Sequence, residues 1–427
     1  MGIIIKNGII VNSDDIADST SDILLEHGKI IRISRRMKTT GHDVIDVAGK
    51  LVLPGLIDCH VHLRQPGRED KETIETGAMA AAKGGFTTIM CMPNTTPVLD
   101  NEMIIEAVKK EAARVGVVNV LPVGSITKGM KGEQLTDMYE LRAAGCVALS
   151  DDGRCVFNSQ LMYLAMQYAK PLGLLLVEHC QDEFLSNNAV MNEGFYSTLL
   201  GLKGDPAVAE TVIVARDIEL ARYLDVKIHF QHISLNRSVE LISRAKQDGV
   251  KVTAEACPHH FTLTDKDVSS FDTNTKVYPP LRTDEDVDAI KKGLQNGVID
   301  CIASDHAPHT VEEKEKGFAE APFGMIGLET SLGLVMTELV DKGIISLTQM
   351  VDKMSTSPAR IFGLETKGVV KEGYDADITI IDPEAEWEVK AEEFMSKSKN
   401  SPFIGRRLKG KVDMTICKGK VVYRDYI

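Results

Sequence analysis

The sequence contains no Cys-x-x-Cys pair, and none of its apolar runs approaches the about 20 residues that a membrane span requires. Most of its eight cysteines lie inside or at the ends of apolar runs, which indicates reduced thiols and predicts a cytoplasmic protein. The first eight residues turn too soon to form a signal peptide. Excess positive charge is also missing, since the net charge is −13. Nucleic acids and anionic membranes are therefore excluded as main partners, because both bind basic surfaces.

The central region, about residues 55–362, alternates short apolar runs with stretches of helical periodicity. The apolar runs are Leu56–His62, Thr87–Met92, Val117–Val123, Cys146–Ser150, Leu174–Val177, Lys227–Gln231, Lys251–Glu255 and Ile299–Ala303. The helical stretches are Thr73–Lys83, Glu102–Val115, Glu133–Ala144, Ser159–Lys170, Ala207–Leu224, Ser238–Gln247, Asp286–Gln295 and Leu328–Leu339. Eight strand–helix units predict an α/β fold of the (β/α)8, TIM-like barrel type. The alternative is an open doubly wound sheet, which the absence of Gly-x-Gly-x-x-Gly at the first helix disfavours.

Both ends of the chain consist of short β-rich segments joined by tight turns. Asn7-Gly8 lies between isoleucine-rich runs and predicts a hairpin, and Lys418-Gly419-Lys420 predicts another near the other end. Neither end forms a convincing sheet alone. We therefore expect residues 1–54 and 363–427 to build one small composite β-sandwich domain beside a barrel of residues 55–362.

A histidine pair, His60 and His62, closes the first apolar run. Residues i and i+2 of a strand point to the same face, so the two imidazoles can bind one ion from one side. An isolated pair of this kind is more often a surface feature at a strand end. Other runs, however, also end in candidate ligands, namely Asp151 and Asp152 after the fourth, His179 after the fifth, His232 after the sixth and Asp305 after the eighth. A barrel gathers these strand ends at one rim.

Four histidines and two aspartates are too many for one tetrahedral ion, and they suit two zinc-like ions about 3.5–4 Å apart that share a bridging ligand and a hydroxide. We expect His60, His62 and Asp305 on one ion, His179 and His232 on the other, and an aspartate between them. Asp152 is the preferred bridge and Asp151 the alternative. Asp305 is placed to accept a proton from metal-bound water and to pass it to a leaving group.

Further polar residues lie near the predicted rim. Arg64 follows the histidine pair and can bind a substrate carboxylate, or it is a plain surface arginine. Asn94 ends the second run, and His309 lies beyond the eighth. The charged stretch 310–317 is expected to be a mobile surface loop, which either closes over substrate or remains solvated.

The remaining histidines of the barrel region are expected to play supporting roles. His306 should point away from the site, and His229 should be a core residue. His259 and His260 should be structural or should support the ligands rather than bind the ions themselves.

The chain resembles the dihydroorotases of the bacterial class I type, within the amidohydrolase superfamily. The similar segments are DCHVHLRQPGRED (58–70), KETIETG (71–77), GGFTTIMCMPNTTPVLD (84–100), SDDG (150–153), EHC (178–180), HISLNRSV (232–239), VTAEACPHHFTLTDKDV (252–268), PPLR (279–282), IASDHAPH (302–309) and APFGMIGLET (321–330). The resemblance covers nearly the whole chain, including both β-rich ends.

The resemblance implies reversible hydrolysis of (S)-dihydroorotate to N-carbamoyl-L-aspartate, a step of pyrimidine (UMP) synthesis. It implies two zinc ions held by His60, His62, Asp152, His179, His232 and Asp305, with Asp305 moving the proton. Substrate contacts are implied for His62, Arg64, Asn94 and His309, and for the backbone near Phe323 and Gly324. Related hydantoinases and allantoinases bridge their metals with a carboxylated lysine, and residues 145–152 contain no lysine.

The sequence departs from this family mainly at Tyr278, which stands where an asparagine usually contacts substrate. A second hypothesis is therefore hydrolysis of another cyclic ureide, such as a hydantoin or allantoin. A third is an inactive scaffold for aspartate carbamoyltransferase, which the complete ligand set disfavours. Association is not readable from the sequence, and a homodimer is the default expectation.

Overall fold

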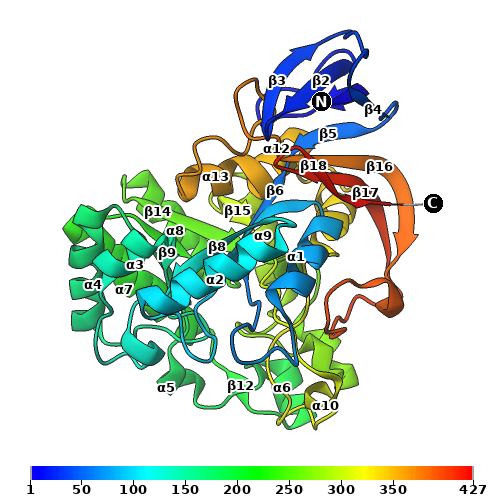
Figure 1. Ribbon diagram of the computed structural model, residues 1–427. Coiled ribbons are helices and arrows are strands. Elements are labelled where there is room, and N and C mark those ends of the chain that lie inside the picture. Colours follow the sequence, from blue (N-terminus) through cyan, green and yellow to red (C-terminus); the bar gives the residue numbers. More distant parts are fainter. Residues whose placement is uncertain (1, 426–427) are drawn as a thin grey trace.

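The computed structural model describes residues 2–425 and contains a parallel barrel beside a second, mixed sheet (Figure 1). Within these residues the barrel strands are β6 (Leu56–Val61), β7 (Phe86–Cys91), β8 (Asn119–Gly124), β9 (Ala148–Leu149), β10 (Leu175–Glu178), β13 (Ile228–Phe230), β14 (Val252–Ala256) and β15 (Cys301–Ile302). They are hydrogen-bonded in chain order, each parallel to the next. This arrangement confirms the predicted barrel.

The barrel is nearly closed by contacts between the segments of its first and last strands. Val61 forms a parallel bridge with His306, and the backbone N–H of His62 donates to the His306 carbonyl at 2.8 Å. The carboxylate of Asp58 accepts the backbone N–H of Ser304 at 3.1 Å. These contacts bring residues about 245 positions apart in the chain to the same place.

Helices cover the outside of the barrel, and the longer ones are α1 (Ile74–Lys83), α2 (Glu102–Val115), α3 (Met138–Ala144), α4 (Ser159–Leu172), α7 (Val208–Leu224), α8 (Asn236–Gln247) and α9 (Asp284–Gln295). Helix α3 begins later than predicted because the Asp137 side chain caps it, accepting the backbone N–H groups of Tyr139 and Glu140. After β15, α11 (Ser331–Val335) continues as a π-helical turn over Met336–Val340. The last helices are α12 (Leu347–Val351) and α13 (Ser357–Ile361).

Short elements are inserted at the carboxyl end of the barrel. They are α5 (Glu183–Ser186), β11 (Met191–Asn192), α6 (Phe195–Leu200) and β12 (Gly204–Asp205) after β10, and α10 (Val311–Lys314) after β15. In Figure 1 they lie together at the bottom of the molecule, on the opposite side from the second sheet. They surround the rim to which the candidate ligands were assigned.

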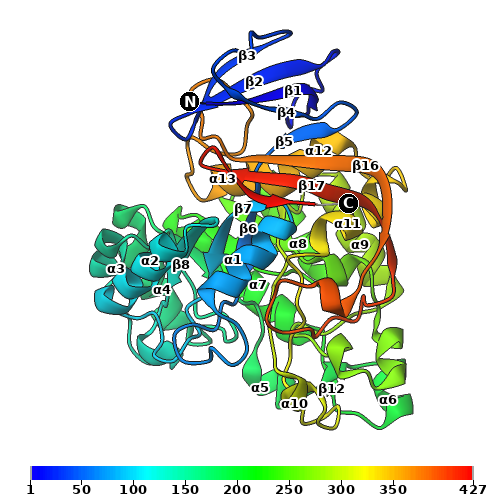
Figure 2. The ribbon, with the colours of Figure 1, turned by 45° about the vertical axis from the view of Figure 1, so that its right-hand side comes forward.

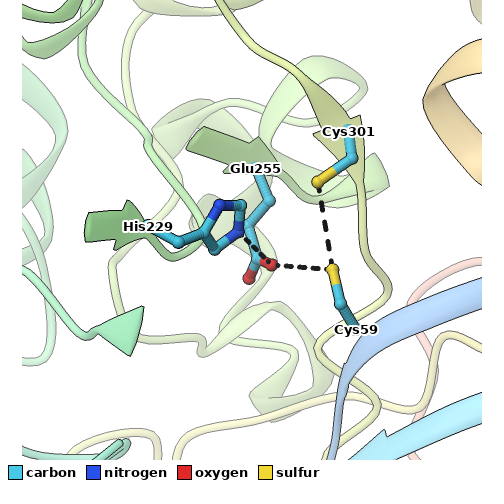
Figure 3. A group of neighbouring side chains, drawn as sticks. All are labelled: Cys59, His229, Glu255 and Cys301. Carbon is cyan, nitrogen blue, oxygen red and sulfur yellow. Dashed lines mark hydrogen bonds and ion pairs between the residues drawn. The ribbon is translucent and has the colours of Figure 1, made fainter. Parts of the chain in front are cut away.

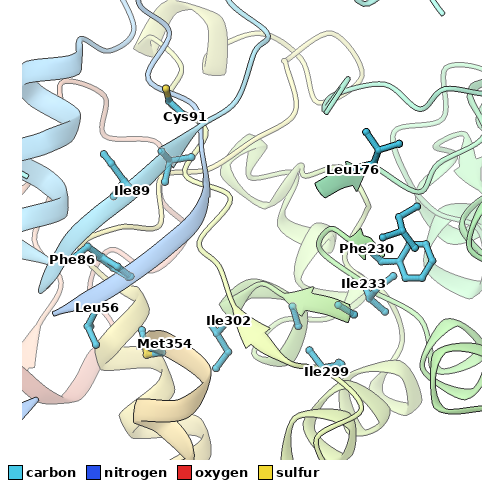
Figure 4. Packing of buried hydrophobic residues seen from close by; sticks show 14 of the residues in the cluster. Leu56, Phe86, Ile89, Cys91, Leu176, Phe230, Ile233, Ile299, Ile302 and Met354 are labelled. Atoms are coloured by element: carbon cyan, nitrogen blue, oxygen red, sulfur yellow. The ribbon is translucent and has the colours of Figure 1, made fainter. Parts of the chain in front are cut away.

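Two apolar layers hold the barrel together. The outer layer packs strand side chains such as Leu56, Phe86 and Phe230 against the helices (Figure 4). The inner layer fills the barrel itself, with Ile57 and Val177 among its buried members. Because consecutive strand side chains face opposite sides, one short apolar strand contributes to both layers.

The second sheet combines the two ends of the chain, with strand order β18-β17-β16-β5-β1-β2-β3 and β4 paired to β1. Its strands are β1 (Ile3–Ile10), β2 (Ser21–Glu26), β3 (Lys29–Ser34), β4 (Asp43–Asp46), β5 (Leu51–Pro54), β16 (Ile378–Glu388), β17 (Arg407–Cys417) and β18 (Lys420–Arg424). Leu51 pairs with Ile381 where the two ends meet. Figure 2 shows the blue and orange–red strands side by side above the barrel. Ile5, Ile23, Ile378 and Ile416 share one buried core.

The predicted hairpin at Asn7-Gly8 is wrong. Both isoleucine-rich runs belong to the single strand β1, and its register with β2 shifts between Ile5 and Gly8. Asn7 has a φ of 61°, so the turn-forming pair makes a bulge instead of a reversal. The predicted hairpin at Lys418-Gly419 is confirmed, because Cys417 of β17 pairs with Lys420 of β18.

Within the part of the chain that the structure describes, no helix has the length and apolar character needed to cross a membrane.

Replacing Phe230 by alanine tests the outer apolar layer. Its side chain is fully buried, so we expect Phe230→Ala to lower the free energy of unfolding by about 3–5 kcal/mol through lost burial and a cavity. Denaturant unfolding followed by circular dichroism measures the change. The control Met103→Ala removes a side chain that is 72% exposed, and it should change stability by less than about 0.5 kcal/mol. Equal effects would contradict the assigned packing.

Candidate active site

Six acidic and imidazole side chains converge at the carboxyl end of the barrel. His60 belongs to β6, and the other five lie just beyond the ends of five strands: His62 after β6, Asp152 after β9, His179 after β10, His232 after β13 and Asp305 after β15. His232 and Asp305 have φ values of 29° and 47°, a left-handed conformation that non-glycine residues rarely adopt. The surrounding fold therefore holds these two side chains in place at a conformational cost.

The carboxylate of Asp152 lies at the centre of the group. Its Oδ2 is 3.2 Å from Nε2 of His60 and 3.2 Å from Nε2 of His62. Asp305 Oδ1 completes this side, at 3.0 Å from Nε2 of His62 and 3.5 Å from Nε2 of His60. Two imidazole nitrogens and two carboxylate oxygens thus face one small volume.

The other oxygen of Asp152 faces a different pair of histidines. Oδ1 is 3.3 Å from Nδ1 of His179 and 3.4 Å from Nε2 of His232, and these two nitrogens are 2.9 Å apart. The Asp151 carboxylate points elsewhere, accepting the backbone N–H groups of Ile126 and Thr127 at 2.8 and 3.0 Å. Burial raises the pKa of Asp151 to about 6. The geometry therefore places Asp152, and not Asp151, between the two histidine pairs.

These donors fit divalent cations. Neutral imidazole nitrogens and carboxylate oxygens that face each other at about 3 Å repel unless a proton or a cation lies between them. Nε2 of His60 is buried and has no hydrogen-bond partner among the described residues. Two buried groups, His60–His62–Asp305 and His60–Asp152–His232, each place their donor atoms within 4.8 Å of one another. The site is thus suited to bind metal.

Outer contacts fix the orientation of the first two imidazoles. Nδ1 of His60 lies 2.7 Å from Oε1 of Glu255, and Nδ1 of His62 lies 2.8 Å from Oδ1 of Asn94. If each Nδ1–H donates to that oxygen, each Nε2 lone pair is directed at the shared volume. Sequence reasoning missed Glu255, although a carboxylate inside the apolar run 252–257 was a usable signal.

A cavity of about 280 Å³ opens above the ligand group. Its lining includes every residue predicted to contact substrate: His62, Arg64, Asn94, Tyr278, His309, Phe323 and Gly324. Asp152, His179, His232 and Asp305 form the part of the lining next to the ligand group. A small molecule in this cavity would therefore touch both sets of residues.

One wall of the cavity is cationic. Nη2 of Arg64 lies 3.3 Å from Nε2 of His309, and Nζ of Lys71 lies 3.1 Å from Nδ1 of the same ring. Burial and these two cations lower the pKa of His309 to about 2, so the imidazole is neutral at physiological pH. Burial lowers the pKa of Arg64 only to about 10, so its guanidinium keeps its charge. Sequence reasoning did not find Lys71, which reaches this wall from the segment before α1.

Another part of the cavity wall is aromatic. The Tyr278 ring centroid lies 5.2 Å from that of His179 and 5.1 Å from that of Phe323. Burial raises the pKa of Tyr278, so the phenol remains a hydrogen-bond donor at neutral pH. At the neighbouring Gly324, a Cβ atom would come within 2.7 Å of the Ala307 methyl group. Glycine thus lets the backbone approach the cavity here.

The other histidines lie outside the group. Nε2 of His306 faces Glu72 at 3.2 Å, and Nε2 of His260 faces the Pro279 carbonyl at 3.0 Å. Burial lowers the pKa of His259 to about 4, so this ring is neutral. His229 is buried inside the barrel.

The stretch 310–317 differs from the expected surface loop. Thr310 caps the short helix α10, and Nζ of Lys314 is buried, donating to the carbonyls of Pro322 and Gly324 at 3.0 and 2.9 Å. Glu313 pairs with Lys71 at 2.9 Å. Residues 310–314 are therefore packed against residues that line or adjoin the cavity.

Family models and solved structures both include proteins similar to this chain. A family model described as dihydro-orotase-like matches residues 49–238, and an amidohydrolase family model matches residues 254–423. In solved structures, the chain is similar to an L-hydantoinase (dihydropyrimidinase) from Arthrobacter aurescens, with a TM-score of 0.89 and 29% identity, covering 99% of this chain and 96% of that one. A dihydropyrimidinase from Brevibacillus agri gives a TM-score of 0.87 and 26% identity, covering 99% and 95%.

Curated relatives are more similar in sequence. A dihydroorotase of Thermoanaerobacter sp. (strain X514) is 51% identical over 424 residues, which are 99% of this chain and 98% of that protein. A dihydroorotase of Pelotomaculum thermopropionicum is 52% identical over 427 residues, the whole length of both chains. The chain belongs to the dihydroorotase family.

Proposed function

We propose that this protein is a metal-dependent cyclic amidohydrolase that reversibly hydrolyses (S)-dihydroorotate to N-carbamoyl-L-aspartate, as part of pyrimidine synthesis. One observation carries the proposal: four histidines and two aspartates converge beneath a small cavity that also presents the Arg64 guanidinium. The first set suits an amide-hydrolysing metal centre, and the second suits a substrate that carries a carboxylate. The family membership supports the same reaction.

The proposed metal centre holds two zinc ions. His60, His62 and Asp305 would bind one ion, His179 and His232 the other, and Asp152 would bridge them through its two oxygens. This partition is supported by the way that Oδ2 and Oδ1 of Asp152 face the two histidine pairs separately. When bound, zinc lowers the pKa of a coordinated water toward 7 and polarises a carbonyl oxygen.

Asp305 is the proposed general base and acid. Water adds across the ring amide: a C–O bond forms at the carbonyl carbon, the C–N bond breaks, and one proton must move from water to the leaving nitrogen. Burial opposes ionisation of Asp305, but positive charge at its His60 and His62 neighbours, which bound ions would supply in their place, outweighs burial and holds the pKa of Asp305 below its usual range. The side chain is therefore a carboxylate that can take the proton and then return it to nitrogen.

The proposed substrate contacts divide between the two cavity walls. Arg64 would bind the substrate carboxylate, and Asn94 and the neutral His309 would add hydrogen bonds to it. The backbone near Phe323 and Gly324 would contact the ring, with His62 and Tyr278 beside it. Among these, Arg64 supplies the charge that selects an anionic substrate.

A second candidate is hydrolysis of an uncharged cyclic ureide such as a hydantoin or allantoin. It is favoured by the Tyr278 phenol between His179 and Phe323, which narrows the cavity on the side where a ring would lie. The solved structures of similar fold, named hydantoinases and dihydropyrimidinases, also point to this class. The identity of about half to dihydroorotases over the whole chain favours the first function.

Our proposals for organisation follow from the same features. We propose domain limits at 1–54, 55–362 and 363–427, supported by the pairing of β5 with β16 beside the barrel. We further propose a cytoplasmic homodimer, because the thiols are free and twofold dimers are the commonest assemblies. We propose aspartate carbamoyltransferase as a candidate protein partner, because its product is N-carbamoyl-L-aspartate, the ring-opened form of dihydroorotate.

Metal removal tests the centre. Chelation should abolish hydrolysis of dihydroorotate, and added zinc should restore it, because the six ligands would otherwise surround an empty volume. At a hundredfold excess of zinc over its dissociation constant, each site that binds only the folded chain should stabilise it by about 2.7 kcal/mol. Magnesium is the matched control, since it prefers six oxygen ligands and should restore little activity. Full activity in metal-free protein would contradict the proposal.

Substitution of Asp305 tests the proton transfer. We expect Asp305→Asn to lower kcat for dihydroorotate by about 10²–10⁴-fold, because the amide cannot carry the proton. Steady-state kinetics and metal analysis of the same preparation separate lost chemistry from lost metal. Asp248→Asn, at a side chain that is 54% exposed, serves as the control and should retain wild-type rates. An Asp305→Asn protein that holds metal and keeps its rate would refute the assignment.

Arg64 discriminates the two candidate functions. We expect Arg64→Lys to raise KM for dihydroorotate by about 10–100-fold, because a hydrogen bond between charged groups contributes about 1.5–3 kcal/mol. Turnover of hydantoin, which has no carboxylate, should not change. Arg154→Lys, at a side chain that is 59% exposed, provides the control. If the wild-type protein opens hydantoin faster than dihydroorotate, the second candidate replaces the first.

A further inference from the structure

A second group of potential metal ligands lies inside the barrel, beneath the rim (Figure 3). Cys59 of β6, His229 of β13, Glu255 of β14 and Cys301 of β15 point toward one another, and all four have 0% exposure. Their surroundings are apolar, since Cys59 and Cys301 belong to the buried cluster that fills the barrel. None of the four is among the ligands assigned to the rim ions.

Two of the donor spacings are close to the edges of a tetrahedron around one ion, and a third is shorter. Bond lengths of about 2.3 Å to sulfur and 2.0–2.2 Å to nitrogen or oxygen give tetrahedral edges of roughly 3.8 Å between two sulfurs and roughly 3.4 Å between nitrogen and oxygen. The two sulfurs are 3.9 Å apart, and Nε2 of His229 is 3.2 Å from Oε2 of Glu255. Cys59 Sγ lies 3.1 Å from Glu255 Oε2, as in a hydrogen bond, and this pair would have to separate to roughly 3.6 Å around an ion. All six donor pairs lie within 4.8 Å.

Hydrogen bonds at the edge of the group involve Nδ1 of His229 and Oε1 of Glu255, so Nε2 and Oε2 of these residues face the other donors. Nδ1 of His229 is 2.8 Å from the Thr253 hydroxyl, so Nε2 is the nitrogen that faces the group. Oε1 of Glu255 is engaged by His60, so Oε2 is the oxygen that faces inward. A neutral His229 that donates through Nδ1 would direct its Nε2 lone pair at this oxygen. That contact is favourable only with an extra proton or with a cation between the two atoms.

We propose that Cys59, His229, Glu255 and Cys301 form a separate, buried site for a divalent transition-metal ion with zinc-like preferences. Two thiolates, one imidazole and one carboxylate are a ligand set that such ions favour over magnesium or calcium. Binding would release the two thiol protons, and a net charge of −1 would remain in place of four separate polar groups. The alternative is a metal-free, hydrogen-bonded core in which the Thr253 hydroxyl donates to Nδ1 of His229, and Nε2–H of His229 and the Cys59 thiol donate to Oε2 of Glu255.

This site would act on the rim through one side chain. Glu255 would bind the inner ion through Oε2 while Oε1 holds Nδ1 of His60. The inner ion would thus fix the Glu255 carboxylate that orients a rim ligand. Because the four ligands come from four strands and are fully buried, the ion would enter during folding and exchange slowly. The rim ions, beneath an open cavity, would exchange faster.

Cobalt substitution tests the proposal independently of activity. The full chain is produced in cells grown in zinc-poor medium with added Co²⁺, so that the ion is present while the chain folds. The rim ligands are only nitrogen and oxygen, whereas the inner site contains two thiolates. We therefore expect three cobalt ions per chain and a thiolate-to-cobalt charge-transfer absorption in the near ultraviolet. Two cobalt ions and no such absorption would overturn the proposal while leaving the proposed function intact.

Cysteine variants identify the source of the absorption. The double variant Cys59→Ser and Cys301→Ser should lose the charge-transfer band and one of three cobalt ions. It should keep the weaker absorption of the two rim cobalt ions, which have no thiolate ligand. Cys257→Ser is the matched control, because Cys257 is a buried thiol in a different group with His259 and His260. It should keep the band. Loss of the band in the control, or its persistence in the double variant, would refute this ligand assignment. If the double variant does not fold, the cobalt content and spectrum of the unaltered chain remain decisive.

Discussion

The structure depends on the near closure of a parallel barrel between its first and last strands. Because all strands run in the same direction, every strand ends at the same rim. The contact of His62 with the backbone and carboxylate of residues 305 and 306 is a direct product of this closure. A sheet open at this point would separate His60 and His62 from Asp305, and these two histidines would lose one of their two carboxylate neighbours.

Burial explains much of the electrostatic arrangement. Each polar side chain at the rim has a polar neighbour. Asp152 lies between the two histidine pairs, and Glu255 and Asn94 contact Nδ1 of His60 and of His62, respectively. On the substrate side, Arg64 keeps its charge while the adjacent His309 is neutral. One wall can therefore provide both a cation and an uncharged hydrogen-bonding ring without placing two positive charges against each other.

Much of the fold and of the candidate site was predictable from sequence, since both depend on local patterns. Apolar runs that end in histidine or aspartate marked the strands and their order, and the barrel rule then placed their ends together. The predicted and observed bounds of α2 agree because Asn101 is a strong signal for the start of a helix and Gly116 for its end. Asn7-Gly8 misled because a turn-forming pair also forms bulges, and the choice depends on which strand lies alongside. Lys71 could not be assigned to the site, because its contacts, with His309 and Glu313, come from a segment that is distant in sequence.

The pairing of β5 with β16 has a consequence for biosynthesis. Ribosomes release the β-rich first 54 residues long before β16 and β17 exist, so the edge of β5 that pairs with β16 and the apolar side chains near it have no native neighbour during most of translation. The nascent amino-terminal strands are exposed to misassociation in that interval. The second sheet can be completed only after β16 and β17 have been synthesised, and a chain that stops early leaves an unpaired strand edge rather than a smaller, finished protein.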